Sequence, residues 1–265
     1  MFPSLDQVTA IVKTFERPES LEILIRSIRR FCPQLRILVG DDSVCSTPRD
    51  DVEYHRFEPD VGASAVRNRL VEQVRTPYFL QLDDDFEFTR CTRIEKLVDA
   101  VVNHDVDLAA GEVENCKRRL GLFLKRKPTN FFGLIFGLIK VHGDHLEMQR
   151  GYHATREKVR LCDIVPQFFV ARRDVVLPMG GWDADPKTEE HEEFFVRAQR
   201  HGLRISHCPE VRVLHWNARP RGYAAYRNRN YQPLAAKKMG IRSWTNLDGV
   251  VRHFLTEPES QRRPQ

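Results

Sequence analysis

Three consecutive aspartates, Asp83, Asp84 and Asp85, are the residues whose type and spacing most directly indicate chemistry. They follow an apolar run, Tyr78 to Leu82, that is typical of a buried strand. Three like charges at one strand end repel each other, and a divalent cation with oxygen ligands relieves that repulsion. Side chains two residues apart on an extended chain point the same way. Asp83 and Asp85 are therefore the expected metal ligands, and Asp84 is expected to point elsewhere, toward a sugar or the backbone. The alternative is a solvated acidic turn.

Polar residues also follow two other predicted strands. The strands are Val8–Lys13 and Leu35–Val39, and the residues after them are Thr14, Arg17, Asp41 and Asp42. Strands alternate with helices over residues 8 to 113, which predicts an α/β fold with a mostly parallel central sheet flanked by helices. Ligands of such sheets bind at the carboxyl ends of the strands. We therefore expect these loops to converge with the three aspartates on one site.

The remaining elements continue the alternation. Apolar residues at helical spacing predict helices at 18–31, 62–74, 94–101, 188–201 and 234–239. Apolar runs predict strands at 52–57, 106–113, 164–171 and 211–214, and a glycine-containing turn predicts a β-hairpin at 136–149. The sequence has neither a dinucleotide-binding glycine fingerprint nor a P-loop. Because no repeat and no flexible linker interrupts the pattern, we predict a single domain.

Composition excludes several classes of protein. The net charge of +5 is mild and no basic helix carries interleaved aromatics, so nucleic acid is not an expected partner. The six cysteines form no C-x-x-C pair, which predicts unpaired thiols in a reducing compartment rather than zinc clusters. We see no signal peptide, and the longest apolar run, 131–139, is too short to span a bilayer. These features predict a cytoplasmic protein, or one that is peripheral at the inner face of the membrane.

Residues 117–127 combine six basic side chains with leucines and a phenylalanine. A segment of this kind is more often a solvated loop with a few apolar anchors. The alternative is a peripheral contact with a membrane surface.

The helix predicted at 188–201 begins with many acidic residues. Acidic side chains suit a helix N-terminus, because its dipole is positive there, and capping is the simple explanation. Four glutamates around one histidine, however, exceed what capping needs. The residues are Glu189, Glu190, His191, Glu192 and Glu193.

Taken together, these motifs resemble the family 2-type glycosyltransferases of the GT-A fold. The resemblance covers roughly residues 8 to 113 and rests on a T-x-x-R-P loop, GDDS, A-x-R-N and DDD, each in its expected place. The second half is similar to the β-1,4-N-acetylgalactosaminyltransferases. The similar motifs there are RGYH (150–153), Cys162-Asp163, PQFFVARRD (166–174), GWDADPKTEEHEEFF (181–195) and VRVLHW (211–216).

The resemblance implies one Rossmann-like GT-A domain over residues 1–265. Residues 1–115 would bind the nucleotide sugar, 116–218 would form the acceptor-side half, and 219–265 would be a C-terminal extension. The implied reaction is an inverting, metal-dependent transfer of a hexose or N-acetylhexosamine, with GalNAc as the first choice. The donor would be a UDP-sugar, the acceptor a hydroxyl of a glycan or glycolipid, and the cofactor Mn²⁺ or Mg²⁺.

The resemblance also implies a role for each site residue. Asp83 and Asp85 match the D-x-D pair that holds the metal against the nucleotide diphosphate, and His215 matches a third metal ligand. Asp84 matches a ribose or donor-sugar contact. Asp41 matches the carboxylate that binds the uracil ring, and Asp42 lies beside it. Thr14 and Arg17 match the loop around the base and the ribose. Arg67 matches a contact to the nucleotide or its phosphate, and Asn68 lies nearby.

The proton acceptor stays open at this point. The family has a Glu-Asp pair at the start of the late helix, and here the pair falls on Glu190 and His191, so that histidine replaces the aspartate. Glu190, His191 and Glu192 are all candidates. Three other functions also stay open. The first is a nucleotidyltransferase, although no glycine-rich triphosphate loop lies near Thr14, and the second is a non-catalytic module that binds sugar nucleotides or glycans. The third is a membrane-surface scaffold, which would rest on residues 117–127 alone.

Overall fold

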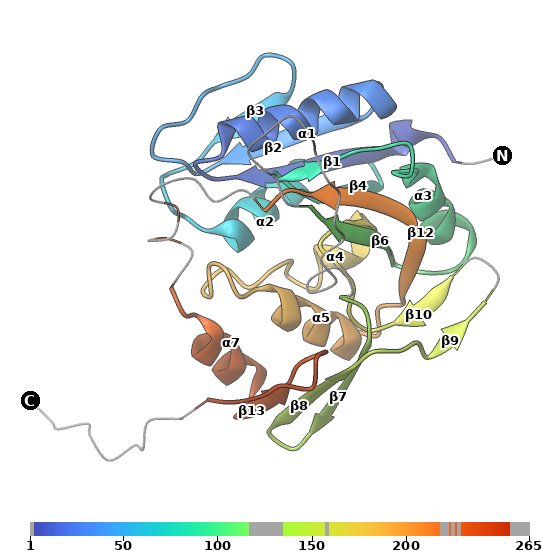
Figure 1. Ribbon diagram of the computed structural model, residues 1–265, viewed down its shortest axis with the longest axis vertical. Helices are drawn as coiled ribbons and strands as arrows, with labels where there is room; N and C mark the ends of the chain where they lie inside the picture. Colours follow the sequence, from blue (N-terminus) through green and yellow to red (C-terminus); the bar gives the residue numbers. More distant parts are fainter. Residues whose placement is uncertain are drawn as a thin grey trace, which may run out of the picture.

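A computed structural model describes residues 3–116, 135–156, 159–217, 223, 226 and 229–254 (Figure 1). The basic segment 117–127, for which a membrane-surface contact is the alternative prediction, lies outside these residues, as do residues 131–134 of the apolar run at 131–139. Within the part of the chain that the structure describes, no helix has both the length and the apolar character needed to cross a bilayer.

The centre of the molecule is a ten-stranded sheet with the order β3-β2-β1-β4-β11-β6-β12-β10-β9, and β5 pairs with β12 at its side. The strands β3, β2, β1 and β4 are parallel, as are β6 and β12, while β11 lies antiparallel between β4 and β6. The bounds are β1 Val8–Thr14, β2 Arg36–Asp41, β3 Glu53–Arg56, β4 Tyr78–Asp83, β5 Phe86–Glu87, β6 Leu108–Asn115, β9 Ala154–Thr155, β10 Arg160–Cys162, β11 Phe169–Arg172 and β12 Ile205–His215.

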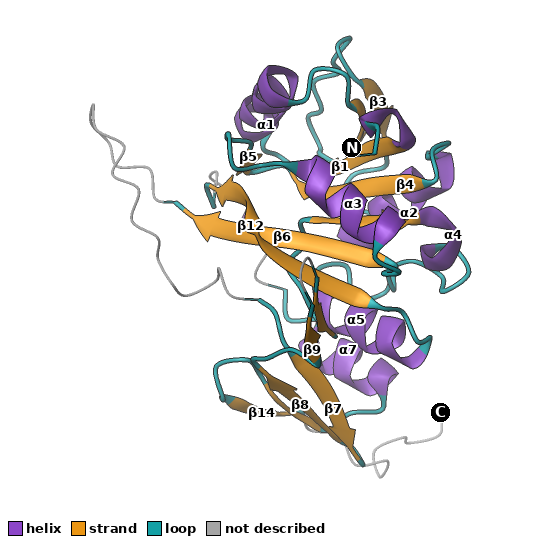
Figure 2. Ribbon diagram, turned by 90° about the vertical axis from the view of Figure 1, so that its right-hand side faces the viewer, coloured by secondary structure: helices purple, strands orange, loops and turns teal. Residues whose placement is uncertain are grey.

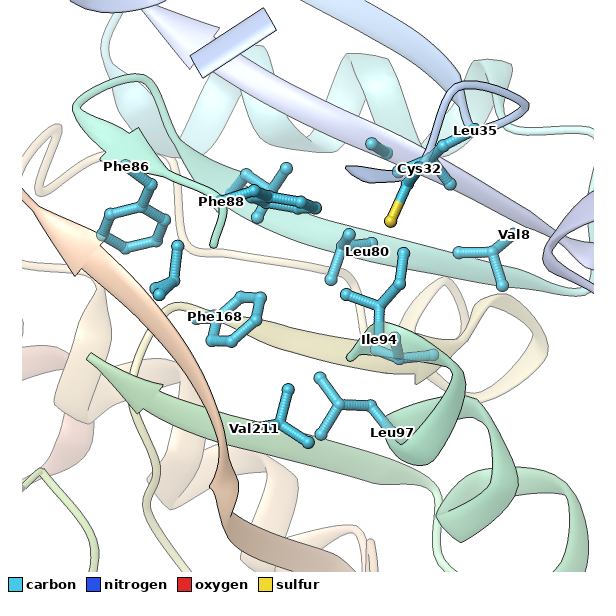
Figure 3. Packing of buried hydrophobic residues seen from close by; sticks show 14 of the residues in the cluster. Val8, Cys32, Leu35, Leu80, Phe86, Phe88, Ile94, Leu97, Phe168 and Val211 are labelled. Atoms are coloured by element: carbon cyan, nitrogen blue, oxygen red, sulfur yellow. The ribbon is translucent and has the colours of Figure 1, made fainter. Parts of the chain in front are cut away.

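Helices cover both faces of this sheet, which confirms the α/β prediction. On one face α1 and α3 share a core with the sheet, and Figure 3 shows part of that core, where Phe88 and Phe168 meet beside Ile94. On the other face α2 and α5 share a second core with the sheet. The helices are α1 Pro18–Phe31, α2 Ala63–Gln73, α3 Ile94–Asn103, α4 Arg173–Val176, α5 His191–Arg200 and α7 Gln232–Met239, and a 3₁₀ helix spans Leu5–Gln7.

Local sequence explains where α1 begins and which way it faces. Pro18 is its first residue, where the missing N–H costs nothing and the fixed φ suits the helix. Leu21, Leu24, Ile25 and Ile28 then recur at helical spacing, and all four are buried against the sheet.

The prediction for the last strand was too short. β12 begins at Ile205, whereas the apolar run predicts a strand only from residue 211. Its pairing with β6 shifts between Cys208 and Arg212, and Pro209 and Glu210 lie in that bulge. The bulge breaks the alternation of apolar and polar residues, which is why the pattern does not show the first half of the strand.

A second, four-stranded sheet has the order β14-β13-β8-β7 and lies at one end of the molecule, beside α7 (Figure 2). The strands β7 Leu138–His142 and β8 His145–Gln149 form the predicted hairpin, while β13 Ser243–Thr245 and β14 Val251–His253 were not predicted. The RGYH motif joins the two sheets. Arg150 donates to Asp248 next to β13 at 2.7 Å, and the Tyr152 hydroxyl lies 2.9 Å from Nδ1 of His207 on β12.

Strand register brings the predicted polar loops to one edge of the main sheet. Thr14, at the end of β1, pairs with Asp41, at the end of β2. On the other side of β1, Lys13 pairs with Asp83, at the end of β4. The far end of β12 reaches the same edge, because His215 pairs with Phe86, the residue after Asp85. The predicted convergence is therefore confirmed.

The bulge of β12 lies close against a glycine of β6, which gives a test of the packing. A Cβ on Gly111 would lie 2.5 Å from a ring carbon of Phe168 and 2.6 Å from the carbonyl oxygen of Val211. Gly111→Ala should therefore lower the free energy of unfolding by about 1–3 kcal/mol, measured in urea. Val102→Ala on the exposed side of α3 is the control and should change it by less than about 0.5 kcal/mol. Unchanged stability of Gly111→Ala would contradict this packing.

Candidate active site

Arg67, on α2, lies between two carboxylates from distant parts of the chain. Its Nη2 donates to Asp83 Oδ1 at 2.8 Å, and its Nη1 donates to Glu190 Oε1. Burial alone would lower the pKa of Arg67, but the charges of Glu190 and Asp83 raise it, so the guanidinium stays charged. The end of β4 is thereby joined to the residue before α5.

Asp83, Asp84 and Asp85 form the acidic strand end of β4. A second arginine, Arg17, holds the two of these aspartates that Arg67 does not contact, Asp84 and Asp85. Its Nε donates to Asp84 Oδ2 at 3.2 Å and its Nη1 to Asp85 Oδ2 at 2.6 Å. The Thr14 hydroxyl also donates to Asp84 Oδ2, at 2.7 Å. Asp84 is 0% exposed, and this burial raises its pKa although Arg17 and Thr14 act in the opposite direction. The buried Asp84 thus orders the loop after β1 and does not reach a surface where it could contact the predicted ribose or donor sugar.

His215 faces Asp85 from the end of β12. Its Nε2 lies 3.2 Å from Asp85 Oδ2, and its Nδ1 lies 2.6 Å from Asn115 Oδ1. Burial lowers the pKa of His215, but the hydrogen bond and charge of Asp85 outweigh it and raise that pKa. For Asp85, burial is likewise outweighed by His215 and Arg17, which lower its pKa. Asn115 fixes the ring of His215, and the sequence patterns did not predict it.

The structure does not assemble the predicted set of three metal ligands. Asp83 is turned to Arg67, and within residues 3–116, 135–156 and 159–217 and the rest of the described chain no three His, Cys, Asp or Glu side chains are arranged to hold a metal ion. Asp85 and His215 do face each other. A carboxylate with an imidazole suits Mn²⁺ or Mg²⁺ when phosphate oxygens and waters supply the other ligands. The donor pair therefore fits such an ion.

The two aspartates at the end of β2 have different surroundings from the predicted ones. Asp41, the predicted uracil contact, accepts hydrogen bonds from the Ser43 N–H at 2.8 Å and from the Tyr54 hydroxyl. Asp42 instead lines a cavity, where it pairs with Lys13 at 2.9 Å. The structure therefore places Asp42, and not Asp41, where a ligand could reach it.

This cavity opens to solvent, and the space between its walls, open solvent included, is about 420 Å³. It lies between the carboxyl ends of β1 and β2, the start of α2 and the segment before α7. Aromatic rings and cationic groups dominate its wall, a lining that suits a planar base and an anionic group. The lining residues are Lys13, Phe15, Asp42, Asp60, Gly62, Ala63, Lys187, Thr188, Tyr223, Tyr226, Arg229 and Tyr231.

Asn68 faces the chain and not the cavity, which corrects its predicted role beside the nucleotide. Its Oδ1 accepts from the Trp182 N–H at 2.8 Å, and its Nδ2 donates to the Trp182 carbonyl at 2.7 Å. A Cβ on Gly181, whose φ is +63°, would lie 2.2 Å from Asn68 Oδ1. Only glycine allows this contact, so Asn68 fixes the loop that leads to α5.

The acidic residues at the start of α5 differ in their partners. Glu190 is bound by Arg67, and Glu193 is bound by Arg197. Burial lowers the pKa of His191 to about 4, so its imidazole is neutral at physiological pH. Burial, with the charges of Glu189 and Glu190, raises the pKa of Glu192 to about 7. A carboxyl group with a pKa near 7 takes up and releases a proton near neutral pH, as a general base must.

Known proteins resemble this chain in sequence and in fold. Residues 9–176 match Glycosyl transferase family 2. The chain belongs to this family. It is 35% identical over 245 residues to human beta-1,4 N-acetylgalactosaminyltransferase 1, a match that covers 83% of this chain and 43% of that protein. It is 32% identical over 213 residues to mouse beta-1,4 N-acetylgalactosaminyltransferase 2, covering 78% of this chain and 39% of the relative. The chain thus spans less than half the length of these relatives.

Solved structures show the fold of this family 2 member. GalNAc-T7, crystallised with UDP, GalNAc and Mn²⁺, superposes with a TM-score of 0.67 at 13% identity and covers 88% of this chain and 47% of that one. S. aureus TarS 1-349 in complex with UDP-GlcNAc superposes with a TM-score of 0.59 at 14% identity, covering 88% and 64%. The GT-A fold and the resemblance to β-1,4-N-acetylgalactosaminyltransferases are both confirmed.

The buried position of Arg67 gives a test that needs no substrate. Arg67→Met leaves two carboxylates without their shared partner, so the free energy of unfolding in urea should fall by about 3–5 kcal/mol. Arg69, on the same helix, has a side chain that is 67% exposed and pairs with Glu72. Arg69→Met is therefore the control and should cost less than about 1 kcal/mol. Equal losses in the two variants would contradict the role of Arg67.

Proposed function

We propose that this chain is an inverting, metal-dependent glycosyltransferase that moves a hexose or N-acetylhexosamine, with GalNAc as the first choice. The donor is a UDP-sugar and the acceptor is a hydroxyl of a glycan or glycolipid. The observation that carries the proposal is the contact of Arg67 with both Asp83 and Glu190, because it joins the acidic strand end to the acid-rich start of α5. The names of the relatives and the UDP, GalNAc and Mn²⁺ bound to GalNAc-T7 support the choice of donor and metal.

The cavity beside this contact is the proposed nucleotide site. Phe15 and Tyr226 offer aromatic faces for the uracil ring, and Asp42 and Lys13 offer polar groups at the cavity wall. Asp85 and His215 would hold Mn²⁺ or Mg²⁺ next to the diphosphate. The metal ion would neutralise negative charge on the departing UDP.

The proposed base is Glu192. In this mechanism an acceptor oxygen attacks the anomeric carbon while the bond from that carbon to the diphosphate oxygen breaks, and Glu192 takes the hydroxyl proton. The chain needs no covalent intermediate for this step. His191 precedes Glu192 and is neutral, so it can form a hydrogen bond with the acceptor hydroxyl without adding a charge to the site. Glu190 acts through Arg67 as a positioning residue.

The proposed base predicts the pH dependence of transfer. Glu192 works as a base only when it is deprotonated, so turnover should rise as the pH increases through about 7. Glu192→Gln should lower turnover by about 10²–10⁴-fold. UDP binding, measured by calorimetry, should stay unchanged. Glu72→Gln, on the exposed side of α2, is the control and should keep the wild-type pH profile. If Glu192→Gln stays active while His191→Gln does not, the base is His191.

The proposed metal site predicts a loss of activity on chelation. We expect UDP release from at least one of UDP-GalNAc, UDP-Gal, UDP-GlcNAc and UDP-Glc in the presence of Mn²⁺. EDTA should abolish it, and Asp85→Asn should lower it by about a hundredfold or more, because charge on the leaving group is no longer neutralised. Asp174→Asn, an exposed aspartate on α4, is the control. UDP release that is indifferent to EDTA and to Asp85→Asn would rule out the metal role. UDP binding without turnover of any donor would favour a non-catalytic module.

A further inference from the structure

One oxygen, Asp85 Oδ2, is contacted by two nitrogens in the structure. Arg17 Nη1 lies 2.6 Å away and His215 Nε2 lies 3.2 Å away. The other ring nitrogen of His215 lies 2.6 Å from Asn115 Oδ1, which holds the ring against Asp85. Of the two nitrogens, that of the Arg17 guanidinium lies closer to the Asp85 oxygen. Arg17 therefore already supplies a positive charge at the oxygen where the metal ion is proposed to bind.

The charges around this point leave room for a divalent ion. Four carboxylates meet two guanidinium groups here: Arg67 serves one pair and Arg17 the other, which leaves two negative charges before His215 is counted. The carboxylates are Asp83, Asp84, Asp85 and Glu190. The aspartates held by Arg17 are both buried, Asp84 at 0% and Asp85 at 4% exposure, so water screens their repulsion poorly.

The two arginines differ in their freedom to leave. The Arg67 side chain is 6% exposed and joins two separate elements, so its removal would part β4 from α5. The Arg17 side chain is 14% exposed, and both of its carboxylates belong to one strand end. If Arg17 moves away, the contact of Arg67 with Asp83 and Glu190 remains, so the end of β4 stays joined to the start of α5.

Arg17 is also connected to the cavity. The ring of Tyr223 covers its guanidinium with 5.1 Å between the Arg17 Cζ and the ring centre, and the same ring lines the cavity. A ligand that enters the cavity thus meets the ring that covers Arg17. A guanidinium binds phosphate oxygens with the same two-pronged geometry that it uses for carboxylates. A diphosphate can therefore accept the hydrogen bonds of Arg17 when a metal ion binds Asp85 in place of the guanidinium.

We propose that Arg17 is an internal counter-ion of the metal site. In the ligand-free chain it occupies the place of the metal at Asp85, and the metal displaces it only when a nucleoside diphosphate enters with the metal and accepts the guanidinium. This inference rests on the proposed function. Because both ligands act on Arg17, the metal ion and the nucleotide bind cooperatively, and each raises the affinity for the other by the same factor.

The test measures Mn²⁺ binding to the full chain by the electron paramagnetic resonance signal of the free ion, with and without UDP. The wild-type chain should bind Mn²⁺ weakly alone and at least about tenfold more tightly with UDP. Arg17→Gln removes the competing charge, so it should bind Mn²⁺ alone at least about tenfold more tightly than wild type. Arg49→Gln is the matched control, because Arg49 pairs with Glu22 and Asp51 away from the site, and it should behave as wild type.

A second variant weakens the hold on Arg17 by changing one of its carboxylate partners, Asp84. Asp84→Asn weakens the anchor of Arg17 and leaves Asp85 and His215 in place, so it too should tighten binding of Mn²⁺ alone. Misfolding would weaken metal binding, so a gain of affinity in either variant cannot come from lost structure. If both variants bind Mn²⁺ alone no more tightly than wild type, while wild type binds Mn²⁺ with UDP, only the role of Arg17 is overturned. If wild type binds no Mn²⁺ even with UDP, the metal-dependent function is overturned and this inference with it.

Discussion

The arrangement of the whole site depends on one buried guanidinium. Arg67 on α2 holds Asp83 at the end of β4 and Glu190 at the start of α5, two residues more than a hundred positions apart in the sequence. A buried charge is stable only when its partners are fixed in place, because desolvation costs several kcal/mol per ion. The second core holds these partners in place, since α2 and α5 both pack in it on the same face of the sheet. The fold therefore sets the distance between the donor end and the acceptor end of the proposed site.

The same principle separates residues that hold the site from residues that can react. Glu190, Glu193 and Asp84 are each bound by an arginine, and their hydrogen bonds are used for structure. Glu192 has no such partner among the interactions that the described chain shows, and its pKa is raised by burial to about 7. A helix start rich in acid can thus contain one reactive carboxylate and several that only position it. Whether a carboxylate here is paired with an arginine therefore decides if it can act as a base, and its residue type does not.

Sequence patterns could predict the elements and their convergence, but not every side chain at the site. The aspartates at the end of β4 and the loops after β1 and β2 were predicted because parallel strands bring their carboxyl ends to one edge of a sheet. The choice between Asp41 and Asp42 depends on Tyr54 of the neighbouring strand, which binds Asp41. The contact of Asn68 depends on a loop 114 residues away, and that of Asn115 depends on a strand register that a bulge shifts. Such long-range contacts leave no periodic trace in a single sequence.

The central claim, that Arg67 and Glu190 act as one unit, is tested most directly by a double-mutant cycle on the free energy of unfolding. The cycle compares wild type, Arg67→Met, Glu190→Gln and the double variant in urea. If the pair is a buried, charge-assisted contact, the double variant should be more stable than the sum of the single losses predicts, by about 1.5–3 kcal/mol. Single losses that add to within about 0.5 kcal/mol would contradict the account, because the two residues would then contribute independently.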